Sequence, residues 1–490
     1  MSEAASSQDG GQSEIKLLPY SFARRHGAVL AANDDGAYAL YLSNLAEPRI
    51  IGEIARHWPD IASVETIDQA RFDGMLSEIY AQRGFDQSAE ADGSQQIDGD
   101  LNSAVQSIEQ AADLLDSDDD APIIRLLNSL LSEAVRTGAS DIHLEPFESQ
   151  IVARLRIDGI LTEIASLSAK LAPYLVSRVK VMARLDIAET RLPQDGRLSL
   201  TLGDKNYDVR VSTLPIRYGE RVVMRLLDKD SGQFDLAELG MDADAREVFD
   251  AALNEPNGII LVTGPTGSGK TTTLYAALDI LNESARNIMT VEDPIEYALH
   301  GISQTQVNNK IGMTFASGLR SILRQDPDIV MVGEIRDRET AEIAVQASLT
   351  GHVVLSTVHT NSAAAAVTRL IDMGIEAYLL ASSLKLVLAQ RLVRRLCSDC
   401  KTQNAEGEWQ AVGCPSCQNN GYRGRLGIYE ILRVDDTIRT MLSNGASEQD
   451  IETHAFAQTR MLADTGYELV KAGETTRAEI MRVARMPDGM

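Results

Sequence analysis

Basic residues are in short supply in this chain. Its 490 residues include 46 Lys and Arg against 71 Asp and Glu, which gives a formal net charge of −25. A surface with this excess of negative charge repels phosphate backbones and anionic lipid headgroups. The composition therefore argues against nonspecific electrostatic binding to nucleic acid or lipid, and we expect no nucleic acid among the partners.

Long apolar runs are also missing. No hydrophobic stretch approaches the roughly 20 residues that a helix needs to span a bilayer. The first eleven residues are polar and lack the apolar segment of a signal peptide. We therefore expect a cytoplasmic protein that contacts the membrane only through its partners.

Cysteine is scarce, and all four cysteines fall in one short segment. They form two C-x2-C pairs, Cys397 with Cys400 and Cys414 with Cys417. Four thiolates complete the tetrahedral shell of Zn²⁺ and leave no position for water, so the predicted zinc is structural. Free thiols or disulfides are the alternatives, and a cytosolic location disfavours disulfides.

A glycine-rich motif lies at the centre of the chain. Residues 258–263 are an apolar run typical of a buried parallel strand, and residues 272–278 are typical of a helix. The segment between them fits G-x-x-x-x-G-K-[ST], and this context favours a phosphate site over a chance glycine-rich turn. The predicted ATP-binding residues are Gly264, Pro265, Thr266, Gly267, Ser268, Gly269, Lys270, Thr271 and Thr272.

These residue types match the chemistry of a bound nucleotide. Glycines allow backbone N–H groups to surround phosphate oxygens, and the helix N-terminus adds its positive dipole end. Lys270 is expected to reach the β- and γ-phosphates, and the Thr271 hydroxyl to hold Mg²⁺. The predicted cofactors are therefore ATP, Mg²⁺ and Zn²⁺.

A candidate for water activation follows the apolar run at residues 329–332. A conventional Walker B motif has an aspartate directly after such a strand, but here Gly333 takes that place and Glu334 follows. We expect Glu334 to polarise the attacking water. Mg²⁺ is then expected to contact Thr271 and to be held otherwise through bridging waters.

Two further segments carry candidate catalytic groups. Residues 288–292 are strand-like and lead into acids, of which Glu292 and Glu296 are candidates for assisting Mg²⁺ or the water. Solvated acids at a strand end are the alternative. His359 follows a buried strand pattern at its ligand-facing end, and a γ-phosphate contact competes there with a structural histidine.

The chain is too long for one hydrophobic core, and its composition changes along its length. Helix and strand patterns alternate in the last part, which predicts a doubly wound parallel sheet. Arg210 and Arg225 lie on strand patterns of the preceding domain, where a solvated sheet face is the alternative to a functional one. The predicted segments are a disordered tail (1–14), a small mixed domain (15–83), an acidic linker (84–120), an α+β domain (121–235) and the α/β motor domain (236–490).

Together these motifs resemble the secretion ATPase superfamily of type II secretion systems and type IV pili. The resemblance covers nearly the whole chain. Residues 18–27 resemble the N-terminal domain of the type II secretion ATPase. Residues 138–146 resemble the start of the domain before the motor. In the motor, the family resemblance is carried by the P-loop, an aspartate box (292–296), the segment 324–337, a histidine box (355–361) and the segment 390–397.

The resemblance implies a RecA-like motor with a zinc loop at 397–417, preceded by a mixed α+β domain and a small docking domain. It implies a homo-hexamer, peripherally associated with the inner membrane. The docking domain is expected to bind the cytoplasmic domain of a bitopic inner-membrane protein, and an inner-membrane platform protein is the expected mechanical target. Arg210 and Arg225 match positions that the family uses near the nucleotide and between subunits.

We therefore expect an ATPase that powers pseudopilus assembly and protein export by a type II secretion system. A type IV pilus assembly ATPase is the alternative within the superfamily. A nucleic-acid translocase is disfavoured by the acidic charge. A scaffold that binds ATP without hydrolysis is disfavoured by the intact Lys270, Thr271 and Glu334.

Overall fold

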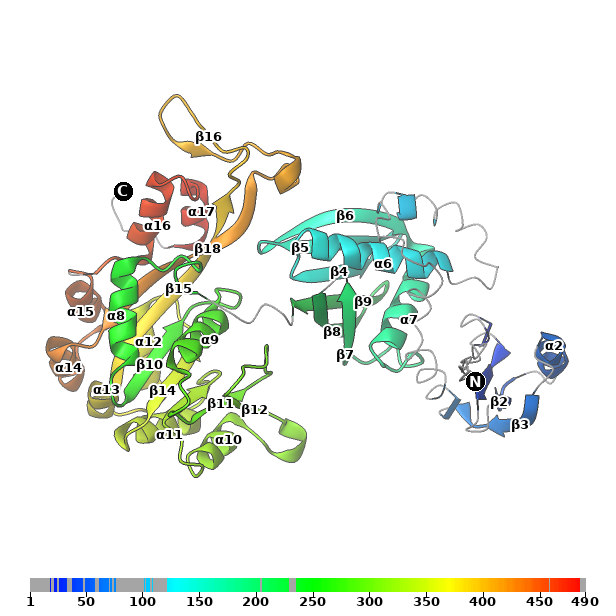
Figure 1. Cartoon of the computed structure of the whole chain (residues 1–490), viewed down its shortest axis with the longest axis horizontal. Coiled ribbons are helices and arrows are strands. Elements are labelled where there is room, and N and C mark those ends of the chain that lie inside the picture. The colour runs from blue at the N-terminus through cyan, green and yellow to red at the C-terminus, as the bar shows by residue number, and fades with distance from the viewer. Residues whose placement is uncertain are drawn as a thin grey trace, which may run out of the picture. The chain divides into compact units, whose positions relative to one another are not determined.

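The protein is described from a computed structural model, in which the chain divides into two compact units, residues 1–228 and 229–490. Each unit is described by itself (Figure 1). Within the described part of the chain, no helix combines the length and the apolar character needed to cross a membrane. The described residues are 18, 22–23, 26–32, 38–46, 49–57, 61–69, 71–72, 75, 101, 103–105, 108, 121–202, 205–228, 235–457 and 459–484.

The first unit begins with a three-stranded sheet and a helix. Strand β2 lies in the middle, antiparallel to β1 and parallel to β3. Leu30, Leu40 and Ile54 are buried in the core that the sheet and helix share. The sequence pattern of residues 37–41 predicts a strand and that of residues 50–57 a helix, and β2 and α2 confirm both, but β1 and β3 were not predicted. Helical patterns also predict helices over 69–82 and 101–115, most of which lie outside the described residues. The elements are β1 (Ala28–Ala32), β2 (Tyr38–Ser43), α2 (Arg49–His57) and β3 (Ile61–Ile67).

The rest of the first unit is a six-stranded antiparallel sheet in the order β6-β5-β4-β9-β8-β7. Helices α6 and α7 pack on its apolar face, where Leu130 and Val179 meet Leu144, Leu155 and Met224. Sequence patterns predict helices over 122–137 and about 172–185, and strands over 151–157, 207–211 and 221–226; the structure confirms all five, but β4, β6 and β7 were not predicted. The elements are α6 (Ala121–Arg136), β4 (Asp141–Pro146), β5 (Gln150–Ile157), β6 (Ile160–Ser168), α7 (Ala172–Met182), β7 (Gln194–Leu202), β8 (Lys205–Ile216) and β9 (Gly219–Asp228).

Arginines share the other face of this sheet. Cross-strand partners project to the same side, and the register places Arg156, Asp141, Arg225, Arg210 and Arg197 in one row across five strands. The buried Asp141 carboxylate lies 2.9 Å from Arg225 Nε and 3.7 Å from Arg156 Nε. The sequence predicts that the arginines of the strand patterns 151–157 and 207–211 share a face; Arg156 and Arg210 do lie in this row, which the buried Asp141 interrupts.

The second unit contains a seven-stranded sheet in the order β12-β11-β13-β14-β10-β15-β18. Its first six strands are parallel, and β18 runs antiparallel to β15. Successive residues of β10 face opposite layers: Ile260 packs in the core that includes α8 and α9, and Leu261 packs in the core that includes α10 to α13. The predicted doubly wound α/β fold is confirmed, with one antiparallel strand at its edge.

The strands of the second unit are β10 (Gly258–Thr263), β11 (Ile288–Glu292), β12 (Ser303–Gln306), β13 (Ile329–Val332), β14 (Val353–Val358), β15 (Leu384–Leu396), β16 (Thr402–Gln403), β17 (Trp409–Gln410) and β18 (Tyr422–Arg433). Its helices are α8 (Ala243–Leu253), α9 (Lys270–Leu281), α10 (Phe315–Ile322), α11 (Arg338–Leu349), α12 (Ala363–Asp372), α13 (Ala377–Ser383), α14 (Asp436–Ser443), α15 (Glu448–Ala455), α16 (Leu462–Lys471) and α17 (Arg477–Val483).

The two edge strands of this sheet differ. Strand β12 is four residues long and consists of polar residues only. Strand β18 is twelve residues long. Several of its backbone groups bond to partners outside the sheet. Among them, the Gly427 N–H donates to the Leu239 carbonyl, and the carbonyls of Tyr429 and Ile431 accept from the hydroxyls of Thr465 and Thr459.

Candidate functional site

The glycine motif forms the loop between β10 and the start of α9, which is the predicted strand–loop–helix arrangement. Gly264 and Gly269 have φ values of +149° and +87°, a region that favours glycine. A Cβ on Gly264 would lie 2.5 Å from the Gln390 carbonyl oxygen, and one on Gly269 would lie 2.8 Å from Gln390 Nε2. Only glycine fits at these two points, so the loop presents backbone rather than side chains.

Lys270 begins α9 and is buried. Its Nζ donates to the carbonyls of Gly264 (2.8 Å) and Pro265 (3.0 Å). Burial lowers the pKa of Lys270 to about 8; Glu334 opposes this shift and Arg391 adds to it. The buried hydroxyl of Ser268 has no hydrogen-bond partner within the described residues. An anionic group bound in this loop would stabilise the ammonium and supply that partner, so the loop fits a phosphate.

Glu334 follows β13 and lies close to two other functional candidates. Its carboxylate pairs with Arg336, and its second oxygen lies 3.4 Å from His359 Nε2 at the end of β14. Burial and the charge of Lys270 lower the pKa of His359, which favours a neutral imidazole at neutral pH. Lys270, Glu334 and His359 therefore converge at the carboxyl ends of three neighbouring strands, where open α/β sheets bind ligands.

Glu292 is buried among hydrogen-bond donors of its own unit. Its Oε2 accepts from Tyr275 Oη at 2.5 Å, and its Oε1 accepts from Thr290 Oγ1 at 2.5 Å and Gln304 Nε2 at 3.0 Å. These donors were not identified from the sequence. The catalytic roles of Glu292 and of Glu296, whose N–H lies 3.3 Å from Tyr275 Oη, stay predictions.

Arg210 and Arg225 belong to the first unit. Arg225 Nε donates to Asp141 Oδ1 at 2.9 Å, a partner that the sequence did not single out. A carboxylate beside a guanidinium offsets part of its charge and orients it. The action of both arginines on the nucleotide stays a prediction.

Two residues of β15 border the P-loop and were not predicted as site residues. Gln390 is buried, and its Oε1 accepts from Thr273 Oγ1 in the first turn of α9 at 2.8 Å. Arg391 is also buried, and its Nη1 would lie 3.1 Å from a Cβ on Gly264. The sequence pointed to these two residues only through the segment 390–397, which is part of the family resemblance; no role was predicted for either.

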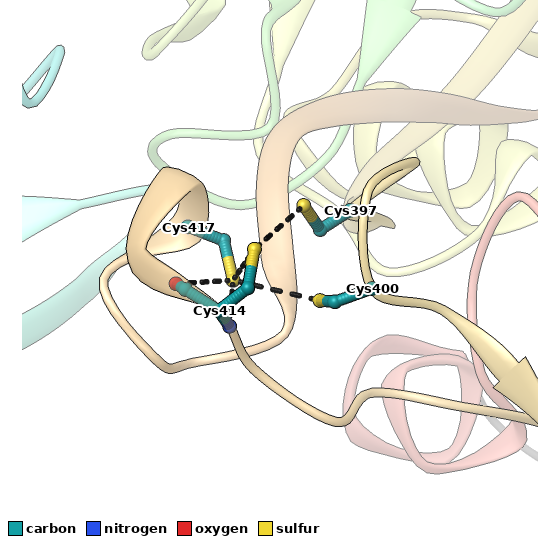
Figure 2. Close-up of side chains that lie close together, drawn as sticks. All are labelled: Cys397, Cys400, Cys414 and Cys417. Carbon is teal, nitrogen blue, oxygen red and sulfur yellow. Dashed lines mark hydrogen bonds between the residues drawn. The ribbon is translucent and has the colours of Figure 1, made fainter.

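The four cysteines converge at the end of β15 and in the turn before β18, as Figure 2 shows. Their Sγ atoms all lie within 4.8 Å of one another. The Sγ–Sγ distances are 3.9 Å for Cys397 with Cys414, 3.7 Å for Cys400 with Cys417, and 3.7 Å for Cys414 with Cys417. Zinc–sulfur bonds of about 2.3 Å in a tetrahedron require sulfurs about 3.8 Å apart, so the cluster fits Zn²⁺.

The backbone also prepares this cluster for a metal. The N–H groups of Cys414 and Gly421 donate to Cys417 Sγ at 3.2 and 3.3 Å. Burial opposes ionisation of the Cys417 thiol, but these hydrogen bonds prevail and lower its pKa to about 7. A thiolate is the form that binds zinc.

Two family models match the chain. The model described as type II/IV secretion system protein matches residues 116–482. A second model, which describes an N-terminal domain of GSPII protein E, matches residues 17–80. Together they match parts of the first unit and most of the second.

Curated relatives resemble the chain over nearly its whole length. The type II secretion system ATPase E of Vibrio cholerae is 51% identical over 489 residues, with 96% of this chain and 97% of the relative covered. The type II secretion system protein E of Pseudomonas aeruginosa is 51% identical over 488 residues, with 96% of each covered.

Solved structures share the fold. The pilus retraction motor PilT with bound ADP matches with a TM-score of 0.53 and 27% identity, over 74% of this chain and 97% of that one. The ATPase DotB of Legionella pneumophila matches with a TM-score of 0.56 and 20% identity, over 73% and 94%. The second likeness concerns the fold alone.

Proposed function

Since the chain belongs to the type II/IV secretion system protein family and is an ATPase of that family, we propose that it powers pseudopilus assembly and protein export by a type II secretion system. The observation that carries this proposal is the 51% identity to type II secretion ATPase E, which extends over nearly the whole of both chains. The match of residues 17–80 to a domain of GSPII protein E supports it, because that model describes protein E itself.

The geometry supports a separate role for each of these residues in ATP hydrolysis. Backbone N–H groups of the P-loop would surround the phosphates, with Lys270 on the β- and γ-phosphates. The Thr271 hydroxyl would hold Mg²⁺, which supplies neutralising charge when bound. Glu334 would orient the attacking water, and His359 beside it would contact the γ-phosphate.

Arg210 and Arg225 remain part of the proposal as arginine fingers. A guanidinium stays charged and binds phosphate oxygens bidentately, as stabilisation of a phosphoryl-transfer transition state requires. Asp141 would hold Arg225 in one orientation until it engages the nucleotide.

A bacterial deletion strain tests the proposed function. We expect exoproteins to accumulate inside a strain that lacks this chain, and the full chain to restore their export, while surface pili remain normal. Export would be measured as the fraction of a secreted enzyme in the medium. Normal export with loss of surface pili would instead support the pilus assembly ATPase.

We further propose that residues 15–83 dock on the cytoplasmic domain of a bitopic inner-membrane protein, and that a homo-hexamer acts on an inner-membrane platform protein. The chain would then be cytoplasmic and peripherally associated with the inner membrane. In the same strain, a chain lacking residues 1–95 is expected to hydrolyse ATP without restoring export or membrane association. Unchanged membrane association of this truncated chain would place the anchor elsewhere.

The four cysteines are proposed to hold a structural zinc, and their removal gives a direct test. Cys397→Ser combined with Cys414→Ser is expected to lower the zinc content from about one ion per chain to near zero, because two of four ligands are lost. ATP binding should largely survive, since the P-loop lies outside the loop. Metal analysis by mass spectrometry measures the change, with Ser398→Ala on the same loop as the control. A wild-type chain purified without zinc would disprove the metal site.

A further inference from the structure

The segment that follows β14 is held by hydrogen bonds at three residues. The Thr360 hydroxyl lies 2.7 Å from the Thr263 hydroxyl of β10, and the Thr360 N–H donates to the same oxygen at 3.0 Å. The Asn361 carbonyl accepts from Arg391 at 2.8 Å. The Ala363 N–H donates to Glu430 of β18 at 2.9 Å. Three strands therefore fix this segment, which begins at His359.

Arg391 makes one of these connections from the opposite side of β10. Strands β14 and β15 lie on opposite sides of β10, so a side chain from β15 that reaches Asn361 crosses the carboxyl end of β10, where the P-loop starts. Nη1 donates to the Gln390 carbonyl at 3.0 Å, and Nη2 also lies 3.4 Å from Asn361 Oδ1. The guanidinium thus bridges β15 and the end of β14.

Burying this guanidinium costs desolvation free energy. Arg391 is only 7% exposed, and within the described part of the chain its hydrogen-bond acceptors are neutral oxygens, while the nearby buried carboxylate of Glu430 offsets part of its charge. A buried charge is destabilising unless its donors are well satisfied. A neutral side chain would fill the same space without this cost, so the position of the bridge points to a role at the site.

His359 is the group that the bridge fixes. Its side chain is 48% exposed and lies 3.4 Å from Glu334, and within the described residues its imidazole is held through that one contact. Its position is therefore set mainly by its backbone, which the Thr360 tie holds one residue away and the Asn361 tie two residues away. We propose that Arg391 is a positioning residue for His359, because it fixes the backbone that places the imidazole beside Glu334.

This inference rests on the proposed roles of Glu334 and His359 in ATP hydrolysis, and a double-mutant cycle tests it. We expect Arg391→Ala and His359→Ala each to lower kcat at saturating ATP by about tenfold or more, because small misplacements at a reacting centre are costly. KM should change by less than about threefold, since the phosphate-binding loop is intact. The double variant should be no slower than the slower single variant.

The neighbouring Arg394 supplies a matched control. It lies on the same strand, but its guanidinium pairs with Glu479 at 2.8 Å and stacks on the Tyr422 ring. The effects of Arg394→Ala and His359→Ala on kcat should therefore multiply. Arg391→Lys, which keeps the charge and one hydrogen bond, should recover part of the lost kcat.

Folding is checked by zinc content and by the thermal midpoint of each variant. If Arg391→Ala does not fold, Arg391→Gln provides the test, since it removes the guanidinium that bridges Gln390 and Asn361 but keeps a polar side chain at this position. It should show the same non-additivity with His359→Ala. Multiplicative effects of an Arg391 substitution and His359→Ala on kcat, or a fully active His359→Ala, would overturn the inference. An inactive wild-type chain would instead contradict the ATPase activity on which the proposed roles of Glu334 and His359 rest.

Discussion

Replacing Lys270 by alanine is expected to abolish measurable ATP hydrolysis, with a fall in kcat of at least about a thousandfold. Its ammonium is the buried cation of the P-loop, held 2.8 Å from the Gly264 carbonyl at the start of α9. Burial strengthens its attraction to phosphate charge, because water does not screen it. Arg391 also lies near the loop, but its donors are directed at the carbonyls of Gln390 and Asn361.

Phosphate release from the purified chain measures this loss. Lys310→Ala is the matched control, because Lys310 is exposed in a turn of the same unit and should leave turnover unchanged. Zinc content and the thermal midpoint would show that both variants fold. Turnover within about tenfold of wild type in Lys270→Ala would exclude this lysine from transition-state stabilisation.

Glu334→Gln is expected to retain nucleotide binding and to turn over at least about a hundredfold more slowly. The amide keeps the shape of the side chain but removes the charge that pairs with Arg336 and faces His359. The loss therefore appears in kcat rather than in nucleotide affinity. Stopped-flow binding of a fluorescent nucleotide and steady-state turnover separate the two quantities.

Glu342→Gln is the control for this substitution. Glu342 is exposed on α11 and pairs with Arg338 at 2.6 Å, so its neutralisation should leave hydrolysis unaltered. Wild-type turnover in Glu334→Gln would point to Glu292 or Glu296 as the activating carboxylate. Glu292 already accepts three hydrogen bonds, so Glu296 would be examined first.

The parts of the site that the sequence predicted are those in which the spacing itself dictates the geometry. Six loop residues between a strand and a helix leave few ways to build a phosphate-binding turn, so Lys270 was identified without the fold. The C-x2-C pairs specify a metal site in the same way. Glu334 was predicted because a parallel strand delivers the residue after it to the ligand-binding edge.

The parts that the sequence did not predict depend on contacts between distant segments. Arg391 and Asn361 are 30 residues apart, and Tyr275 and Glu292 are 17 residues apart. The run 390–397 contains several arginines, and their order along the chain does not show which one lies behind the P-loop. Strand β4 was overlooked because all its residues are buried and they include Asp141 on the arginine face, a residue type that strand patterns usually place outside.

The edges of the motor sheet have a consequence for the behaviour of the protein at high concentration. Unpaired strand edges are templates for uncontrolled aggregation between chains. Here one edge strand is four polar residues long, and the backbone of the other is engaged by Leu239, Thr459 and Thr465. Cross-chain strand pairing is thereby discouraged on both sides. A subunit contact made by this sheet would therefore form through side-chain surfaces rather than through strand pairing, and such surfaces can change one residue at a time.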